Sequence, residues 1–135
     1  MIVMDACAAC EISRLTDEGN ALKQLAQEDE LIVSCDLIHA ELASAFRKIA
    51  LREGLDVKEA ETFVSDALRM VDEFYPLEPL RTEALNESIR LHHSTYDMFY
   101  FVLARRLGAT LFTLDRKLMA LCEENGVDCI GEVEF

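Results

Sequence analysis

Thirteen basic and 26 acidic residues give this 135-residue chain a net charge of −13, which argues against nonspecific nucleic-acid binding over most of its surface. Its 51% apolar residues argue against intrinsic disorder, and the longest uninterrupted apolar run, residues 98–104, is too short to span a membrane. The opening residues MIVMD lack the basic segment of a signal peptide, so we expect one cytoplasmic domain over residues 1–135, with its own core and reduced cysteines.

Short apolar runs alternate with amphipathic segments along the chain, which predicts alternating strands and helices. In chain order we expect a strand over residues 1–4, helices over 6–15 and 20–27, a strand over 31–33, helices over 36–52 and 56–73, at most a short edge strand over 74–80, helices over 81–91 and 97–107, a strand over 111–113, a helix over 115–124 and a strand over 127–130. This order predicts an α/β fold with a mainly parallel central sheet and helices on both faces.

Local signals support several of these boundaries. Asp36 is in the position of a helix cap, and Asp56 with Glu59 three residues later resembles a capping box. Pro76 and Pro79 are the only prolines of the sequence, and they confine the strand near them to an edge of the sheet.

Four acidic residues fall where parallel strands end or where the following helices begin. Asp5 ends the first strand, and Asp115 follows the strand over residues 111–113 by two positions. Asp97 begins the helix that leads into that strand, and Glu41 lies one turn into the helix after the second strand. Because ligands of open α/β sheets bind beyond the carboxyl ends of the strands, we expect all four carboxylates at one edge of the sheet.

Clustered carboxylates repel one another and raise their own pKa values, which a divalent cation relieves. All-oxygen ligation favours Mg²⁺ or Mn²⁺ over zinc, and such an ion can activate water and stabilise charge on a phosphoryl oxygen. Asp36, Asp97 and Asp115 can each also be explained as acids that stabilise a helix N-terminus. Glu41 is harder to explain in this way, because it borders the apolar face of its helix, where an unpaired carboxylate is costly.

Three segments resemble the PIN-domain family, specifically the small VapC-like toxin ribonucleases. They are IVMDAC at residues 2–7, LIHAELASAFRK at residues 37–48, and STYDMFYFVLARRLGATLFTLDRKLMAL at residues 94–121, and the similarity covers essentially the whole chain. The resemblance implies a three-layer PIN-like fold and a metal-dependent endoribonuclease. Its acidic metal-site and catalytic residues would be Asp5, Glu41, Asp97 and Asp115, with Thr113 as a supporting hydroxyl and Mg²⁺ or Mn²⁺ as the cofactor.

The same resemblance implies an RNA substrate, a homodimer and a protein antitoxin whose basic side chain enters the acidic site. Two positions depart from the family pattern, since Cys7 replaces a small hydroxyl or amide residue and Met98 replaces an alanine. Both could alter the geometry of the site or its metal preference. The basic residues considered as RNA contacts are Arg14, Arg47, Lys48, Arg105, Arg106, Arg116 and Lys117.

Two other functions remain open at this stage. Cys7 and Cys10 form a CxxC motif between a strand and a helix, as in thioredoxin-like redox proteins, although the order of elements differs from that fold. The second alternative is a PIN-fold binding or dimerisation module without catalysis. His92 and His93 are explained as ordinary residues at a helix end, and we assign them no role.

Overall fold

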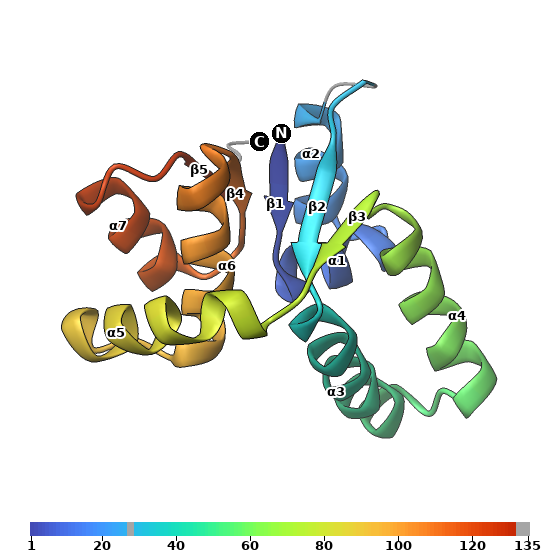
Figure 1. The fold of residues 1–135 in the computed structure, drawn as a ribbon. Helices are drawn as coiled ribbons and strands as arrows, with labels where there is room; N and C mark the ends of the chain where they lie inside the picture. The colour runs from blue at the N-terminus through green and yellow to red at the C-terminus, as the bar shows by residue number, and fades with distance from the viewer. Residues whose placement is uncertain (27–28, 132–135) are drawn as a thin grey trace.

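The computed structural model describes residues 1–26 and 29–131 of the chain. Its elements are β1 (Ile2–Met4), α1 (Ala6–Ser13), α2 (Asp17–Leu25), β2 (Ile32–Cys35), α3 (Leu37–Glu53), α4 (Val57–Arg69), β3 (Glu73–Tyr75), a short 3-10 helix (Glu78–Leu80), α5 (Arg81–Leu91), α6 (Thr95–Leu107), β4 (Thr110–Phe112), α7 (Arg116–Glu124) and β5 (Cys129–Ile130). The strands form one sheet in the order β3-β2-β1-β4-β5, and every pairing is parallel (Figure 1).

The sheet separates two layers of helices, because successive side chains of a strand point to opposite faces. Val3, Val33 and Leu111 are fully buried in one hydrophobic cluster, which includes residues of α5, α6 and α7. Ile2, Met4 and Phe112 belong to the other cluster, together with residues of α1 to α4. The α/β fold with a parallel sheet between helices is thus confirmed.

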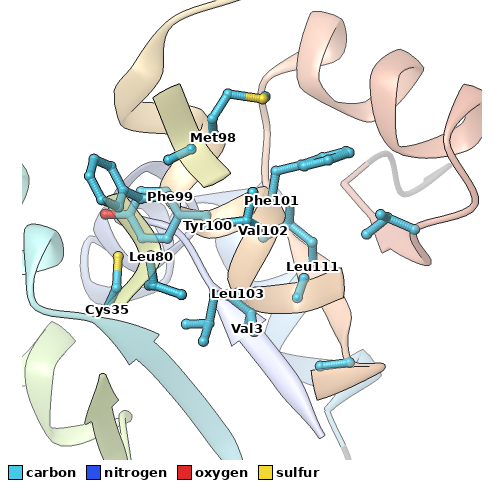
Figure 2. Close-up of a cluster of buried hydrophobic side chains, with 14 of the residues drawn as sticks. Val3, Cys35, Leu80, Met98, Phe99, Tyr100, Phe101, Val102, Leu103 and Leu111 are labelled. Carbon is cyan, nitrogen blue, oxygen red and sulfur yellow. The ribbon is translucent and has the colours of Figure 1, made fainter. Parts of the chain in front are cut away.

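Helix α6 is the most deeply buried helix of the first layer. Residues 98–104 are all buried, so this helix lies inside the domain rather than on its surface. Figure 2 shows its side chains beside Val3 and Leu111 of the sheet and beside Leu80 and Cys35. An apolar run too short for a membrane is therefore a core helix, and Asp97 is fixed at its beginning. Within residues 1–26 and 29–131, the structure contains no helix with the length and apolar character needed to cross a membrane.

Helix α2 begins earlier than predicted. The sequence suggested residue 20, whereas the helix starts at Asp17 after Thr16, whose hydroxyl accepts a hydrogen bond from the Gly19 amide. A Cβ atom at Gly19 would collide with the backbone carbonyl of Glu11, so this glycine permits close packing of α1 and α2 rather than breaking the helix. Residue 27, the predicted end of this helix, lies outside the described residues.

Two further helix starts or ends and one capping role differ from the prediction. Helix α4 ends at Arg69 instead of residue 73, because the chain there turns into β3 and the Asp72 amide donates to the Ile32 carbonyl. Helix α6 begins at Thr95, two residues before Asp97. Asp36 has helical backbone angles and makes no side-chain capping bond, so its predicted capping role is wrong.

The remaining local signals hold. Asp56 and Glu59 form a complete capping box at the start of α4. β3 lies at one edge of the sheet, as the two nearby prolines require, and β5 forms the other edge over Cys129–Ile130 only.

Candidate metal centre

The pairing of β1 with β4 places Asp5 beside Thr113. Met4 pairs with Phe112 in the register of these strands, and the Asp5 amide donates to the Phe112 carbonyl at 3.2 Å. Asp5 and Thr113 therefore follow neighbouring parallel strands at the same edge of the sheet. Thr113 is fully buried, and its hydroxyl is hydrogen-bonded to the Asp5 carboxylate.

Asp5 is a buried carboxylate held in one orientation. Its side chain is the N-terminal cap of α1, with Oδ1 accepting from the Ala8 amide at 2.9 Å. Burial raises the pKa of Asp5 from 3.8 to about 7, and the charges of Asp97 and Glu41 add to this rise, although the Ala8 and Thr113 hydrogen bonds oppose it. The charged form of Asp5 is consequently unfavourable without a cation.

Glu41 approaches the same region from α3. It is half-buried, and its Oε1 accepts a hydrogen bond of 2.7 Å from the hydroxyl of Tyr100, a residue of the core helix α6. Burial raises the pKa of Glu41, the Tyr100 hydrogen bond lowers it, and the nearby Asp97 raises it. The tyrosine thus fixes a carboxylate that burial makes costly to ionise.

Asp97, Asp115 and His93 form the tightest group. One potential ligand atom from each of the three residues lies within 4.8 Å of the others. The Nε2 atom of His93 is 2.7 Å from Oδ2 of Asp97. Burial raises the pKa of Asp97, which His93 opposes and the adjacent Asp115 carboxylate reinforces.

Asp115 is held by the turn that follows β4. Its Oδ1 caps α7 by accepting from the amides of Lys117 and Leu118, at 2.9 and 3.1 Å. Its own amide donates to the Thr113 hydroxyl at 3.1 Å. Thr113 therefore connects the loop carrying Asp115 to the Asp5 carboxylate.

The four predicted acids are electrostatically coupled. Asp97 interacts with Asp5, Glu41 and Asp115, which makes it the centre of the group. Among residues 1–26 and 29–131, the ion pairs give Asp5, Glu41 and Asp97 no arginine or lysine partner. The expected rise in pKa is confirmed for Asp5, Glu41 and Asp97, but burial contributes more to it than mutual repulsion does.

The donor set of this region fits a divalent cation. It offers carboxylate oxygens and one imidazole nitrogen, which are ordinary ligands of Mg²⁺, Mn²⁺ and other divalent ions. These oxygens are fixed, three of the carboxyl groups have raised pKa values, and none of those three has an arginine or lysine partner among the described residues, so a divalent ion would neutralise their charge. Two residues of this arrangement escaped the sequence analysis. Tyr100 was indistinguishable from core, and His93 was treated as an ordinary helix-end residue.

A groove extends away from the acidic group between α1 and α3. It has a volume of about 780 Å³, and its lining includes Glu41, Lys48 and Arg52 of α3 together with Arg14 and Tyr96. Glu41, Lys48 and Arg52 are spaced so that they share one side of their helix. We call this feature the α1–α3 groove. Arg105 and Arg106, by contrast, are paired with acids of α5 and lie outside it.

Cys7 and Cys10 do not have the properties of a redox motif. All five thiols are free. Cys7 is exposed and Cys10 is buried, and loss of solvation is the main cause that raises their pKa values to about 12 and about 11. A thioredoxin-like cysteine needs a depressed pKa to supply a thiolate, so these thiols lack the activation on which the redox hypothesis depends.

Comparison with known proteins identifies the family of this chain. The PIN domain model matches residues 2–124, and this chain belongs to the PIN-domain family.

Its curated relatives narrow this class to VapC ribonucleases. The chain is 35% identical over 118 residues to VapC ribonuclease Mb0985 of Mycobacterium bovis, an alignment that covers 87% of this chain and 88% of the relative. Ribonuclease VapC12 of Mycobacterium tuberculosis is 30% identical over 118 residues, covering 87% and 89%.

Two solved structures share the fold. PAE2754 from Pyrobaculum aerophilum superposes with a TM-score of 0.68 at 22% identity, covering 88% of this chain and 84% of that one. Mycobacterium tuberculosis VapC20, a Sarcin-Ricin loop cleaving toxin, superposes with a TM-score of 0.64 at 18% identity, covering 90% and 95%. At these identities the two structures support the fold alone.

Proposed function

We propose that this protein is a divalent-metal-dependent endoribonuclease that hydrolyses RNA phosphodiester bonds and acts as the toxin of a toxin–antitoxin pair. The observation that carries the proposal is the group of Asp5, Glu41 and Asp97, whose pKa values are all raised and which have no arginine or lysine partner among the described residues. The ribonuclease names of its VapC relatives support the reaction.

In this proposal Asp5, Glu41, Asp97 and Asp115 hold Mg²⁺ or Mn²⁺. The bound ion supplies a Lewis acid that activates water and stabilises charge on the phosphoryl oxygens. The chain's own residues orient the ligands in advance. The Ala8 amide and the Thr113 hydroxyl hold Asp5, and the Tyr100 hydroxyl holds Glu41. Such preorganisation reduces the rearrangement needed when the ion and the substrate bind.

The α1–α3 groove is the proposed path of the RNA. It starts at Glu41 and continues along α3 past Lys48 to Arg52, both exposed cations that can neutralise backbone phosphates. Tyr96, at 62% exposure, offers a surface on which a base can stack. A restricted basic track of this kind lets a strongly acidic protein bind one RNA strand without attracting nucleic acid over its whole surface.

The proposal includes a homodimer, a cytoplasmic location and a protein antitoxin. A basic antitoxin side chain placed among Asp5, Glu41 and Asp97 would neutralise the same charge as the metal ion. The net charge of −13 also favours a basic partner.

Replacing Asp97 with asparagine tests the proposed function most directly. Asp97→Asn keeps the size of the side chain but removes the charge at the centre of the acidic group. We expect RNA cleavage in Mg²⁺ or Mn²⁺ to fall by roughly 100-fold or more, since loss of even supporting residues at metal sites costs about 10–100-fold. Cleavage of a labelled single-stranded RNA, with and without EDTA, measures this.

Asp66→Asn provides the control, because Asp66 is exposed on α4 and pairs only with the nearby Arg69 in the described structure. It should cleave at the wild-type rate. Wild-type cleavage by Asp97→Asn, or full activity in excess EDTA, would overturn the proposal. If the purified wild type binds metal and its partner but never cleaves RNA under any metal condition, the alternative of a noncatalytic binding module takes its place.

A further inference from the structure

His93 is the only nitrogen ligand candidate in the acidic group of the described chain. It lies between α5 and α6, where the chain reverses direction. Its side chain has 11% of its surface exposed, and its Nε2 atom approaches Asp97 to 2.7 Å. A histidine at the end of an exposed helix would ordinarily be solvated, so this inward placement needs a structural cause.

The backbone around His93 supplies that cause. His92 has left-handed backbone angles, φ 52° and ψ 46°, which are uncommon for a residue other than glycine. This conformation ends α5. Ser88 then binds His93 twice: its carbonyl accepts from the His93 amide at 3.2 Å, and its hydroxyl donates to the His93 carbonyl at 2.7 Å.

Thr95 strengthens this arrangement from the other side. Its hydroxyl donates to the Ser88 hydroxyl oxygen at 3.0 Å, so the first residue of α6 is tied to the same serine. A strained residue and a three-point serine contact therefore fix the backbone of His93 next to Asp97. Strain of this kind persists where the surrounding structure holds it, and it is enriched at functional sites.

The spacing of the side chains matches that of metal ligands. Two adjacent ligands of an octahedral ion at about 2.1 Å lie about 3 Å apart, and opposite ligands lie about 4.2 Å apart. The His93–Asp97 separation of 2.7 Å is close to the first value, and the 4.8 Å limit on the group with Asp115 requires only a small contraction to reach the second. The three side chains can thus all reach one metal ion.

We propose that His93 Nε2 is a direct metal ligand and makes the site select Mn²⁺ over Mg²⁺. This inference rests on the metal site of the proposed function. Mg²⁺ prefers oxygen ligands, whereas an imidazole nitrogen improves the affinity for first-row transition ions. Binding uses the neutral imidazole with its proton on Nδ1, which leaves the Nε2 lone pair for the ion. The site therefore differs from an all-carboxylate site in its choice of ion.

Metal binding by the RNA-free protein tests this, with Mn²⁺ and Mg²⁺ as the probes. Calorimetry should show that His93→Gln binds Mn²⁺ about 10–100-fold more weakly than wild type does. Its Mg²⁺ affinity should change by about twofold at most, because the amide oxygen of glutamine can bind Mg²⁺ in place of the imidazole. Glutamine also keeps a donor for Asp97. Pulsed EPR of bound Mn²⁺ should detect imidazole nitrogen couplings in wild type and none in His93→Gln.

His92→Asn is the matched control. It removes the neighbouring exposed imidazole, and asparagine tolerates the left-handed conformation, so both affinities and the nitrogen couplings should match wild type. Absence of imidazole couplings in wild type, or equal losses of Mn²⁺ and Mg²⁺ affinity in His93→Gln, would overturn the inference. If wild type cleaves RNA but His93→Gln keeps the metal selectivity of wild type, only this inference is wrong. If wild type binds Mn²⁺ selectively but does not cleave RNA, only the proposed function is wrong.

Discussion

Two groups of acidic side chains in this protein have opposite electrostatic environments. On α5, Glu83 accepts hydrogen bonds of 2.6 Å from both Arg105 and Arg106, and Glu87 is bound by Arg90 and Arg105. The arginines hold the pKa values of both glutamates below the usual range. In the candidate metal centre, Asp5, Glu41 and Asp97 have raised pKa values.

The contrast separates carboxylates that are neutralised within the chain from those of the candidate metal centre. The α5–α6 acids are neutralised within the chain, so their ionised form supports the packing of two helices. The acids of the metal centre have no such cation among the described residues, and their ionised form destabilises the metal-free fold. A divalent cation bound at the candidate site would balance this charge.

The largest expected effect comes from removing the most buried acid. Asp5 has a folded-state pKa of about 7 and an ordinary value of 3.8, a difference equivalent to roughly 4 kcal/mol. Because the folded pKa is the higher one, this stability is fully present below about pH 4 and is lost as the pH rises to 7. In metal-free protein at pH 8, Asp5→Asn should therefore raise the free energy of unfolding by up to about 4 kcal/mol.

Urea unfolding in EDTA between pH 4 and pH 8 measures this effect. Between pH 4 and pH 8 the free energy of unfolding should fall much less in Asp5→Asn than in wild type. Asp66→Asn, which changes an exposed acid on α4, should retain the wild-type decline. A pH profile identical in wild type and Asp5→Asn would remove the distinction between the two groups of acids.

A middle-sized effect is expected from Tyr100→Phe. This change keeps the buried ring in the core but removes the hydroxyl that donates to Glu41 at 2.7 Å. Hydrogen bonds to charged groups contribute about 1.5–3 kcal/mol, so unfolding at neutral pH should become easier by roughly that amount. Tyr96→Phe supplies the control, since Tyr96 is 62% exposed on the same helix. Equal stabilities of the two variants would mean that Tyr100 merely packs.

The smallest effect is expected among the paired acids. Glu83→Gln breaks two ion pairs that are partly exposed to solvent, so it should lower stability by only about 0.5–1 kcal/mol. Because the folded pKa of Glu83 is lowered, this contribution is present at neutral pH and disappears as the pH falls below the ordinary value of 4.5. Urea unfolding at pH 7 in low and in 1 M salt measures it, and salt should remove most of the difference. A gain in stability would place Glu83 with the acids of the metal centre.

Much of the fold follows from local patterns in the sequence. The buried strands are recognisable in the sequence as short apolar runs. The capping box of Asp56 and Glu59 predicts a helix start from local sequence alone. The end of α4 does not follow in this way. Met70 and Glu73 continue a helical pattern, but pairing of the third strand with β2 overrides that local preference.

The candidate site was partly predictable for a geometric reason. Parallel strands end at one edge of a sheet, so Asp5 and Asp115 could be expected together from their positions alone. Their roles as metal ligands stay a prediction. His93 could not be expected there, because its placement depends on the left-handed His92 and on Ser88, a residue one turn earlier on α5. Histidine is enriched among non-glycine residues with left-handed angles, but that preference does not indicate where the next side chain points.

The central position of β1 links the site to the order in which the chain is made. β1 is synthesised first, yet it needs β2 on one side and β4 on the other. Until residues 110–112 have emerged, Asp5 has no Thr113 beside it and no neighbouring Asp115. A nascent chain on the ribosome therefore carries an incomplete set of these acids until Asp115 has been added. Any activity of this site begins only when the later strands have joined the sheet.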